Sequence, residues 1–292
     1  MYSNFEILGK YTYKIFNALE AKSAKLTRKQ ISINGLPIDY YDNENIKSPA
    51  LLLLHGFSAD KNAWNRIAKY LTKDYRLIVP DLLGHGDTPY SPSTNYSAFT
   101  QAEMCQTLVK ELKLQNICVI GNSMGGMIAM ILHDKAPKEF TKAVLIDPAG
   151  AKTKFAIELD RLGANPFAHK DKSTVIKFYG LTMAKMPFIP KSVLSFIAKS
   201  QYIDKNQQLI HMFKDFFNIN EFFELPFSNS PDDVLILWGK EDKMMPLENA
   251  DFYQELTHQA PLIIYPGVGH MPMFEIPEKT ANDIKNFLSK TK

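Results

Sequence analysis

The sequence lacks the features of several protein classes. Its 292 residues contain only two cysteines, Cys105 and Cys118, which are too few for a disulfide framework. The formal net charge is only +3, from 34 basic and 31 acidic side chains, and this argues against nucleic acid as a main partner. No apolar run approaches the roughly 18 residues that a membrane-spanning helix needs. A disulfide scaffold, a nucleic-acid-binding protein and a membrane-spanning protein are therefore not expected.

The composition is that of a folded globular protein. Hydrophobic residues make up 45% of the chain and charged residues 22%, which excludes disorder of the whole chain. The length suits one large domain, or one core with an insertion, and is sufficient to bury a sizeable interior.

Residues 1–29 are predicted to form an amphipathic helical segment. Residues 1–30 contain six basic side chains against two acidic ones, whereas the rest of the chain is almost neutral. Apolar side chains recur along the segment at helical spacing: Phe5, Leu8, Tyr11, Ile15, Phe16 and Leu19. Such a helix can pack on the protein with its lysines solvated, or lie on an anionic membrane surface, and both interpretations stay open. The segment lacks the uninterrupted apolar stretch of a signal peptide, so we expect a cytoplasmic protein, peripheral at the membrane surface under the second interpretation.

Strands and helices alternate over residues 30–150 and again over 231–292. Asn34-Gly35 separates two short strand patterns and predicts a hairpin. Continuous apolar runs predict buried strands at 50–54, 76–81, 116–121, 142–147, 234–238 and 262–265, and helical patterns predict helices at 64–71, 97–113, 124–135 and 277–289. This alternation predicts an α/β fold, with a mostly parallel central sheet flanked by helices.

Residues 151–230 interrupt the alternation. They contain helical patterns and thirteen aromatic side chains but no convincing buried strand, so we predict a helical cap, or lid, inserted between two strands of one sheet. The aromatic residues, together with Met183, Met186 and Met212, suggest an apolar roof that could accept an acyl chain. Most of these side chains are expected to form the small core of the cap itself.

The strongest chemical pattern is Gly121-Asn122-Ser123-Met124-Gly125, a G-x-S-x-G sequence between a predicted strand and a predicted helix. A strand that turns sharply into a helix holds the central serine strained and exposed above the sheet. Gly121 and Gly125 are expected there because a Cβ atom would collide with the neighbouring chain. Ser123 is therefore the candidate nucleophile, although the bare pattern also occurs in turns that are only structural.

A serine hydroxyl becomes a good nucleophile only when a base removes its proton and an acid orients that base. His270 is the candidate base, because it lies in a Gly/Pro-rich loop directly after the last predicted strand. Asp242, directly after the strand at 234–238, is the candidate acid. Its neighbour Glu241 is expected to face another direction. Asp147 remains a rival because it also ends a predicted strand.

The backbone N–H groups of Phe57 and Met124 are the candidate oxyanion donors. Phe57 follows the buried strand at 50–54, and Met124 begins the helix after Ser123. His55 is expected to support this loop rather than to take part in the reaction. The turn at 81–87, which follows the next strand, is interpreted as scaffold.

These segments together resemble the α/β-hydrolase superfamily over roughly residues 30–290. The resemblance is specific because five separated motifs occur in the right order: His55-Gly56-Phe57, Asp81-Leu82-Leu83-Gly84-His85-Gly86, Gly121-Asn122-Ser123-Met124-Gly125-Gly126, Gly239-Lys240-Glu241-Asp242 and Gly269-His270. The stretch from His55 to Lys61 and the strand end Asp147-Pro148-Ala149-Gly150 are most similar to bacterial lipases and monoacylglycerol-lipase-like esterases.

The resemblance implies a serine hydrolase that cleaves carboxylic esters through an acyl-enzyme, with Ser123, Asp242 and His270 as its triad. We expect a small, lipid-like ester such as a monoacylglycerol as substrate, with no metal, no organic cofactor and no nucleic acid. Some relatives of this kind attach to a membrane by their N-termini.

Other branches of the superfamily are weighed from single positions. Dehalogenases and epoxide hydrolases use an aspartate nucleophile, where this chain has Ser123. Carbon–carbon hydrolases of aromatic ring-cleavage pathways share Ser-Met-Gly-Gly, but usually carry a glycine-rich loop where this chain has Phe57-Ser58-Ala59-Asp60. They remain the alternative, together with haloperoxidase-like members. A ligand-binding protein without enzymatic activity is a further alternative, although such a protein would be expected to lack part of the triad.

Overall fold

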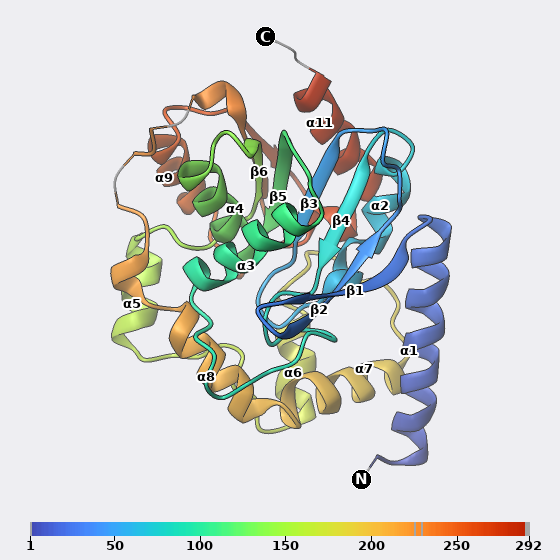
Figure 1. Cartoon of the computed structure of the whole chain (residues 1–292). Coiled ribbons are helices and arrows are strands. Elements are labelled where there is room, and N and C mark those ends of the chain that lie inside the picture. Colours follow the sequence, from blue (N-terminus) through green and yellow to red (C-terminus); the bar gives the residue numbers. More distant parts are fainter. Residues whose placement is uncertain (1, 225, 229, 290–292) are drawn as a thin grey trace.

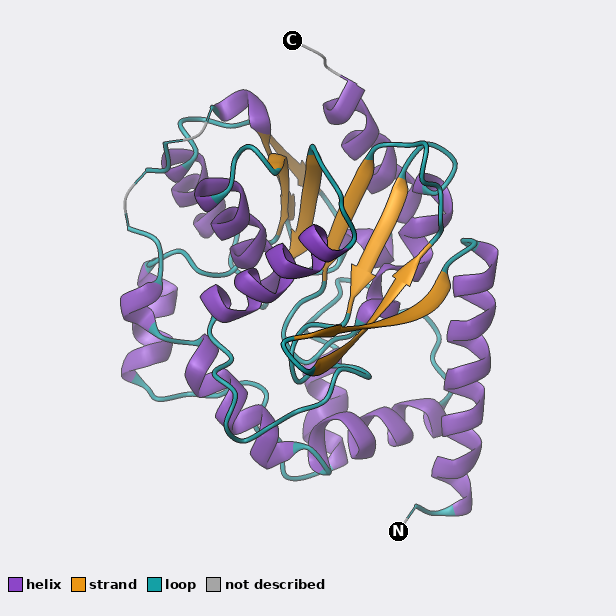
Figure 2. Cartoon of the chain, in the orientation of Figure 1, coloured by secondary structure: helices purple, strands orange, loops and turns teal. Residues whose placement is uncertain are grey.

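The computed structural model describes residues 2–224, 226–228 and 230–289. A few positions of the predicted domains lie outside the described residues: residue 1 of the N-terminal segment, residues 225 and 229 of the cap, and residues 290–292 of the core. The architecture is an α/β sandwich in which helices cover both faces of one twisted sheet (Figure 1, Figure 2). The predicted fold class is confirmed.

The sheet has eight strands in the order β1-β2-β4-β3-β5-β6-β7-β8. The pairs β1–β2 and β2–β4 are antiparallel and the remaining pairs are parallel. The strands are β1 (Thr27–Ile33), β2 (Leu36–Asp42), β3 (Ala50–Leu54), β4 (Arg76–Pro80), β5 (Ile117–Asn122), β6 (Phe140–Ile146), β7 (Val234–Gly239) and β8 (Leu262–Tyr265). Strands β3 and β5 are buried along their whole length, as expected for central parallel strands.

The hairpin between β1 and β2 turns at the predicted dipeptide. Asn34 and Gly35 both have positive φ, 50° and 80°, which is the requirement of a type I′ turn.

Helices on the two faces enclose two separate apolar cores. One face packs against α3 (Ala98–Glu111), α4 (Met124–Lys135) and α9 (Glu248–Leu256), and the other against α2 (Asn65–Leu71) and α11 (Pro277–Ser289). Alternate residues of β3 enter different cores: Leu52 and Leu54 face the first, and Leu51 and Leu53 the second. This alternation is the period of a β-strand, so an uninterrupted apolar run serves both faces.

Between β6 and β7 the chain leaves the sheet and forms a group of helices. These are α5 (Lys154–Arg161), α6 (Lys172–Tyr179), α7 (Lys191–Ile197), a π-helical turn (Ala198–Ile203) and α8 (Asn206–Phe216). They lie below the carboxyl ends of the strands in Figure 1. This is the stretch for which the sequence predicts a cap over residues 151–230.

Helix α1 (Asn4–Ser23) runs along one side of the molecule and packs against α7 (Figure 1). It is shorter than the predicted segment 1–29, because β1 already begins at Thr27. Ser3 caps its first turn, and the Glu6 carboxylate accepts a hydrogen bond from the Ser3 N–H in return. None of the helices in the described part of the chain combines the length and the apolarity needed to cross a bilayer.

The contact between α1 and α7 is close enough to require a glycine. A Cβ atom on Gly9 would lie 2.0 Å from the carbonyl oxygen of Ser192, so the two backbones touch there. We expect Gly9→Ala to lower the free energy of unfolding by about 1–3 kcal/mol through overpacking. Urea denaturation followed by circular dichroism measures this. In an unobstructed helix the same change stabilises by about 1 kcal/mol, so a gain in stability would contradict the described contact.

Candidate active site

Ser123 occupies a strained turn at the carboxyl end of β5. Its φ and ψ angles are 55° and −119°, and α4 begins at the next residue. A Cβ atom on Gly121 would lie 1.9 Å from the Gly125 carbonyl oxygen, and one on Gly125 would lie 2.1 Å from that of Leu54. The predicted need for both glycines is thus explained by backbone packing around the turn. This geometry directs the Ser123 side chain away from the sheet edge.

Asn122, the residue before the serine, connects the turn to the loop of His270. Its Nδ2 atom donates to the carbonyl oxygens of Ile146, at 3.1 Å, and His270, at 2.9 Å. The amide therefore fixes the spacing between the serine and histidine segments. This role was missed in the sequence, although Asn122 lies inside the motif that singled out Ser123.

His270 and Asp242 form a direct, buried pair. The His270 Nδ1 atom lies 2.6 Å from Asp242 Oδ2, and both residues are 7% exposed. The other carboxylate oxygen of Asp242 accepts the backbone N–H groups of Met244 and Met245. Because Oδ1 is occupied in this way, Oδ2 points at the imidazole. The arrangement leaves His270 Nε2 as the nitrogen available to a reacting group.

Glu241 and Asp147 lie nearby but differ from Asp242 in their bonding. The Glu241 carboxylate accepts the backbone N–H groups of Gly267 and Val268, so it braces the His270 loop. Asp147 accepts the N–H of Gly239 through Oδ1, while its Oδ2 is buried without a partner among the described residues. Burial, and then the charge of Asp242, raise the pKa of Asp147 well above its usual range. The raised pKa favours the neutral form of the Asp147 carboxyl.

The two candidate oxyanion donors flank Ser123. A Cβ atom on Gly56 would contact Ser123 Cβ at 3.2 Å, so the loop that carries Phe57 passes close beside the serine. Within the described residues, neither Phe57 N–H nor Met124 N–H donates to an acceptor of the protein. Both amides can thus bind a developing negative charge.

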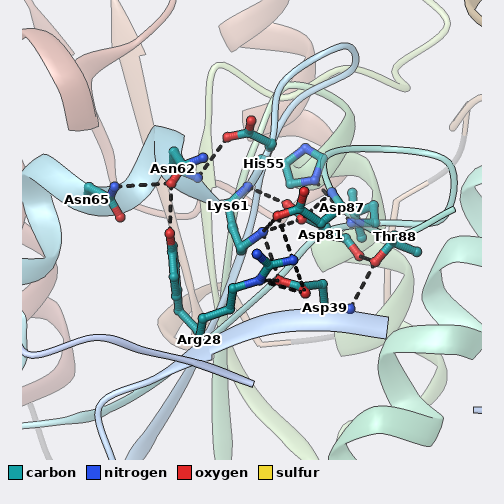
Figure 3. Close-up of polar contacts among 12 residues, drawn as sticks. Arg28, Asp39, His55, Lys61, Asn62, Asn65, Asp81, Asp87 and Thr88 are labelled. Atoms are coloured by element: carbon teal, nitrogen blue, oxygen red, sulfur yellow. Dashed lines mark hydrogen bonds and ion pairs between the residues drawn. The ribbon is translucent and has the colours of Figure 1, made fainter. Parts of the chain in front are cut away.

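A buried lysine fixes the loop that carries Phe57. Figure 3 shows the ammonium group of Lys61 among three carboxylates, those of Asp39, Asp81 and Asp87. The Lys61 side chain is 2% exposed, and its backbone N–H also donates to Asp81 at 2.7 Å. These contacts join the segment after β3 to the turn after β4. The carboxylates raise the pKa of Lys61 although burial opposes this, so its ammonium occupies a cluster that could otherwise hold a cation.

Two buried histidines support the same loop as neutral groups. His55 donates through Nδ1 to Gly56 O and accepts the Leu82 N–H at Nε2, as the sequence led us to expect of a supporting residue. His85 packs edge-on against the Phe57 ring, with ring centroids 5.4 Å apart. Burial lowers the pKa of His55 to about 4 and, with the nearby His55, that of His85 to about 3. Protonation of either ring would disturb the loop.

A cavity of about 590 Å³ is lined by Ser123 and His270. Apolar side chains from the segment 151–230 form much of its wall, among them Phe155, Leu159, Phe178 and Met183. Of the other two methionines singled out in the sequence, Met212 is buried in the core and Met186 is partly exposed, and neither lines this cavity.

The segment between β6 and β7 is attached directly to the loops that carry the candidate residues. The N–H of His270 donates to Thr182 O at 3.1 Å, and the carboxylate of Glu275 accepts the N–H groups of both Gly269 and Ala184. Ser58, beside Phe57, lies 3.0 Å from the hydroxyl of Tyr202. The sequence did not reveal Glu275 in this role, since a glutamate at a helix end is usually solvated.

A family model described as alpha/beta hydrolase fold matches residues 49–277. Lipase 3 of Moraxella sp. (strain TA144) is 34% identical over 284 residues, which cover 94% of this chain and 89% of the lipase. Lipase 1 of Psychrobacter immobilis is 32% identical, with 95% and 89% covered. Monoacylglycerol lipase ABHD6 of Homo sapiens is 26% identical, with 82% and 75% covered.

Solved structures give the same relationship. A crystal structure of a membrane phospholipase A, described as a bacterial virulence factor, superposes with a TM-score of 0.85 and 26% identity and covers 96% of this chain and 91% of its own. The lip1 protein of Acinetobacter baumannii AYE superposes with a TM-score of 0.83 and 28% identity, with 99% and 97% covered.

The two buried aspartates should respond differently to the same isosteric change. Burial favours the neutral form of the Asp147 carboxyl, and Asp147→Asn puts a neutral amide in its place, so we expect activity at pH 7–8 to stay within about threefold of the parent protein. Asp242→Asn removes the charge opposite His270 and should lower kcat about 10⁴-fold. Steady-state assays on an activated ester compare the two. Equal losses in both variants would show that Asp147 shares the orienting role.

The neutral histidines predict acid sensitivity of the folded state. The unfolded chain protonates His85 below its ordinary pKa of 6.5, whereas the folded chain resists until about 3, so stability falls as the pH drops below 6.5. At pH 5 the resulting loss in the free energy of unfolding that is due to His85 is about 2 kcal/mol. In His85→Phe the drop in unfolding free energy between pH 7.5 and pH 5 should shrink by this amount, while Leu83 O keeps its bond from Gln101. An unchanged drop in urea titrations would contradict the neutral state of His85.

Proposed function

The chain belongs to the α/β-hydrolase fold family, and we propose that it is a serine hydrolase that cleaves lipid-like carboxylic esters through an acyl-enzyme. The observation that carries this proposal is the arrangement around one cavity. Ser123 lies in a strained turn on its wall, and His270, bonded to Asp242 at 2.6 Å, lines the same space. A nucleophile, a base and an orienting acid are the parts that acyl transfer requires.

In the proposed reaction, the Ser123 Oγ atom attacks the ester carbonyl carbon while His270 Nε2 takes its proton. Asp242 holds the imidazole through Nδ1 and stabilises its charged form. The N–H groups of Phe57 and Met124 bind the oxyanion of the tetrahedral intermediate, and one such donor contributes about 2.7–4 kcal/mol. The bond to the leaving oxygen then breaks, and His270 protonates the departing alcohol. Water, activated by His270, releases the acid from Ser123.

The walls of the cavity support a lipid-like substrate. About 590 Å³ of space bounded mainly by aromatic and aliphatic side chains suits an acyl chain, which gains free energy by leaving water. Relatives over most of the chain are named lipases and monoacylglycerol lipases. We propose that residues 151–230 act as the cap that supplies these walls, and that medium or long acyl groups bind there.

The nucleophile and the acyl preference can be tested together. We expect Ser123→Ala to lower hydrolysis of p-nitrophenyl esters at least about 10³-fold, because the remaining groups give only residual catalysis. Rates measured from acetate to palmitate should rise beyond butyrate as the cavity fills. Ser93→Ala, at an exposed loop position, is the matched control and should leave every rate unchanged.

Three outcomes would overturn parts of the proposal. Full activity in Ser123→Ala would remove Ser123 as the nucleophile. A protein that hydrolyses none of the esters but is labelled at Ser123 by a fluorophosphonate would instead indicate carbon–carbon bond hydrolysis. A protein that shows neither ester hydrolysis nor labelling would indicate a ligand-binding protein.

A further inference from the structure

Helix α1 is attached to the protein through its polar face. Glu6 is 3% exposed and pairs with Lys172, which lowers the pKa of Glu6 to about 2. Further along the helix, Asn17 O accepts a bond from Asn65 at 3.3 Å, and Glu20 pairs with Arg66 at 3.2 Å. Gly9 supplies the close backbone contact with α7. The hydrogen-bonding and small residues of α1 thus face inward.

The apolar face of α1 consequently points to solvent. Six large side chains on it are each between 50% and 60% exposed: Phe5, Leu8, Tyr11, Ile15, Phe16 and Leu19. Apart from the adjacent Ile15 and Phe16, they are three to four residues apart, which places them along one side of the helix. A helix on the surface of a globular protein normally buries such a side and exposes its polar one. The inverted orientation means that the apolar stripe of α1 is available to something outside the fold.

Positive charge accompanies the stripe. Lys14, Lys22 and Lys25 are exposed and Lys10 is half-buried, and no carboxylate among the described residues forms an ion pair with any of them. The acidic residues of α1, Glu6 and Glu20, are already paired with cations of the body. The outward surface is therefore apolar with basic side chains around it, which complements an anionic lipid surface.

The exposed stripe is continuous with the cavity over Ser123. Phe16, at least half exposed on α1, also lines that cavity, as does the adjacent Thr12. Two further exposed apolar side chains line the same space: Phe188, which is 93% exposed, and Leu181, which is 42% exposed. Exposed apolar side chains of the outer face of α1 and of the cavity wall therefore belong to one continuous surface through Phe16.

We propose that the outer face of α1, together with Phe188 and Leu181, docks on an anionic lipid surface, so that an ester enters the cavity directly from the lipid phase. This inference rests on the proposed ester hydrolase function and adds the source of its substrate. A second copy of the chain is a poorer occupant. In a symmetric dimer through α1 the same face meets itself, which brings the unpaired lysines together. Anionic headgroups would neutralise them instead.

Docking can be measured without turnover by using Ser123→Ala as the parent. Leu8→Gln/Ile15→Gln changes two stripe residues that do not line the cavity, and Ile46→Gln/Ile264→Gln changes two exposed apolar residues elsewhere. Binding is followed by sedimentation with vesicles of phosphatidylcholine containing phosphatidylglycerol. We expect the α1 variant to bind at least tenfold more weakly than the parent and the control variant to bind like the parent. Equal binding by all three proteins would overturn the proposal.

The charge contribution is tested by Lys14→Gln/Lys22→Gln, with Lys73→Gln/Lys138→Gln as an equally charged control. Each lysine at an anionic surface should contribute about fivefold to binding, and the effect should fade with added salt. Only Lys14→Gln/Lys22→Gln should lose affinity for the anionic vesicles. The Ser123→Ala parent should bind poorly to vesicles of phosphatidylcholine alone. Equal losses in the two variants would show only an effect of net charge and would overturn a specific docking face.

Activity assays separate docking from catalysis, and they use the protein with an intact Ser123 as the parent. In this background, Leu8→Gln/Ile15→Gln should hydrolyse soluble p-nitrophenyl butyrate within twofold of the parent, yet hydrolyse a monoacylglycerol held in anionic vesicles at least tenfold more slowly. An absence of ester hydrolysis in this parent would refute the proposed function while the binding results stand. A parent that is dimeric by light scattering, and a variant that is monomeric, would identify a second copy as the occupant and overturn the lipid proposal.

Discussion

The site depends on one steric constraint, the passage from β5 into α4 within a single residue. Ser123 takes up a positive φ angle there, and the chain can pass only because Gly121 and Gly125 lack side chains. A Cβ atom at these two positions would lie 1.9 Å and 2.1 Å from backbone oxygens. The buried parallel strands on either side hold this strain in place. The turn fixes the position of the Ser123 hydroxyl relative to the backbone N–H of Met124, the first amide of α4. The other groups of the site are arranged around these two.

The surrounding groups come from loops that follow other strands, and buried polar contacts hold those loops in register. Asn122 links the serine turn to the His270 loop, Glu275 links that loop to the loop between α6 and α7, and Lys61 anchors the segment that carries Phe57. A buried ammonium is stable only when its carboxylate partners are also fixed, so the Lys61 cluster constrains both loops that it joins. The geometry of the site is thus set by groups that need not touch a substrate.

The sequence predicted the fold class and the strand positions because their causes are local. Apolar runs, the Asn34-Gly35 turn and the glycines beside Ser123 each express a short-range requirement, and chain order brings strand ends to one edge. It could not predict the roles of Lys61 or Glu275, whose partners are distant in the chain and whose side chains are usually solvated. Nor could it exclude Asp147 as the partner of His270, since Asp147 and Asp242 both follow strands and only their contacts separate them.

The orientation of α1 shows the same limit most clearly. The periodicity of its apolar residues correctly predicted a helix, but an amphipathic pattern fixes only the existence of two faces and not which one is buried. That choice was made by distant partners: Lys172 for Glu6, Arg66 for Glu20 and the backbone of α7 for Gly9. These contacts hold α1 by its polar side, and Thr12 and Phe16 of the same helix line the cavity. An apolar surface kept exposed by specific polar contacts is costly in water, and it is best explained by a surface that covers it while the substrate enters.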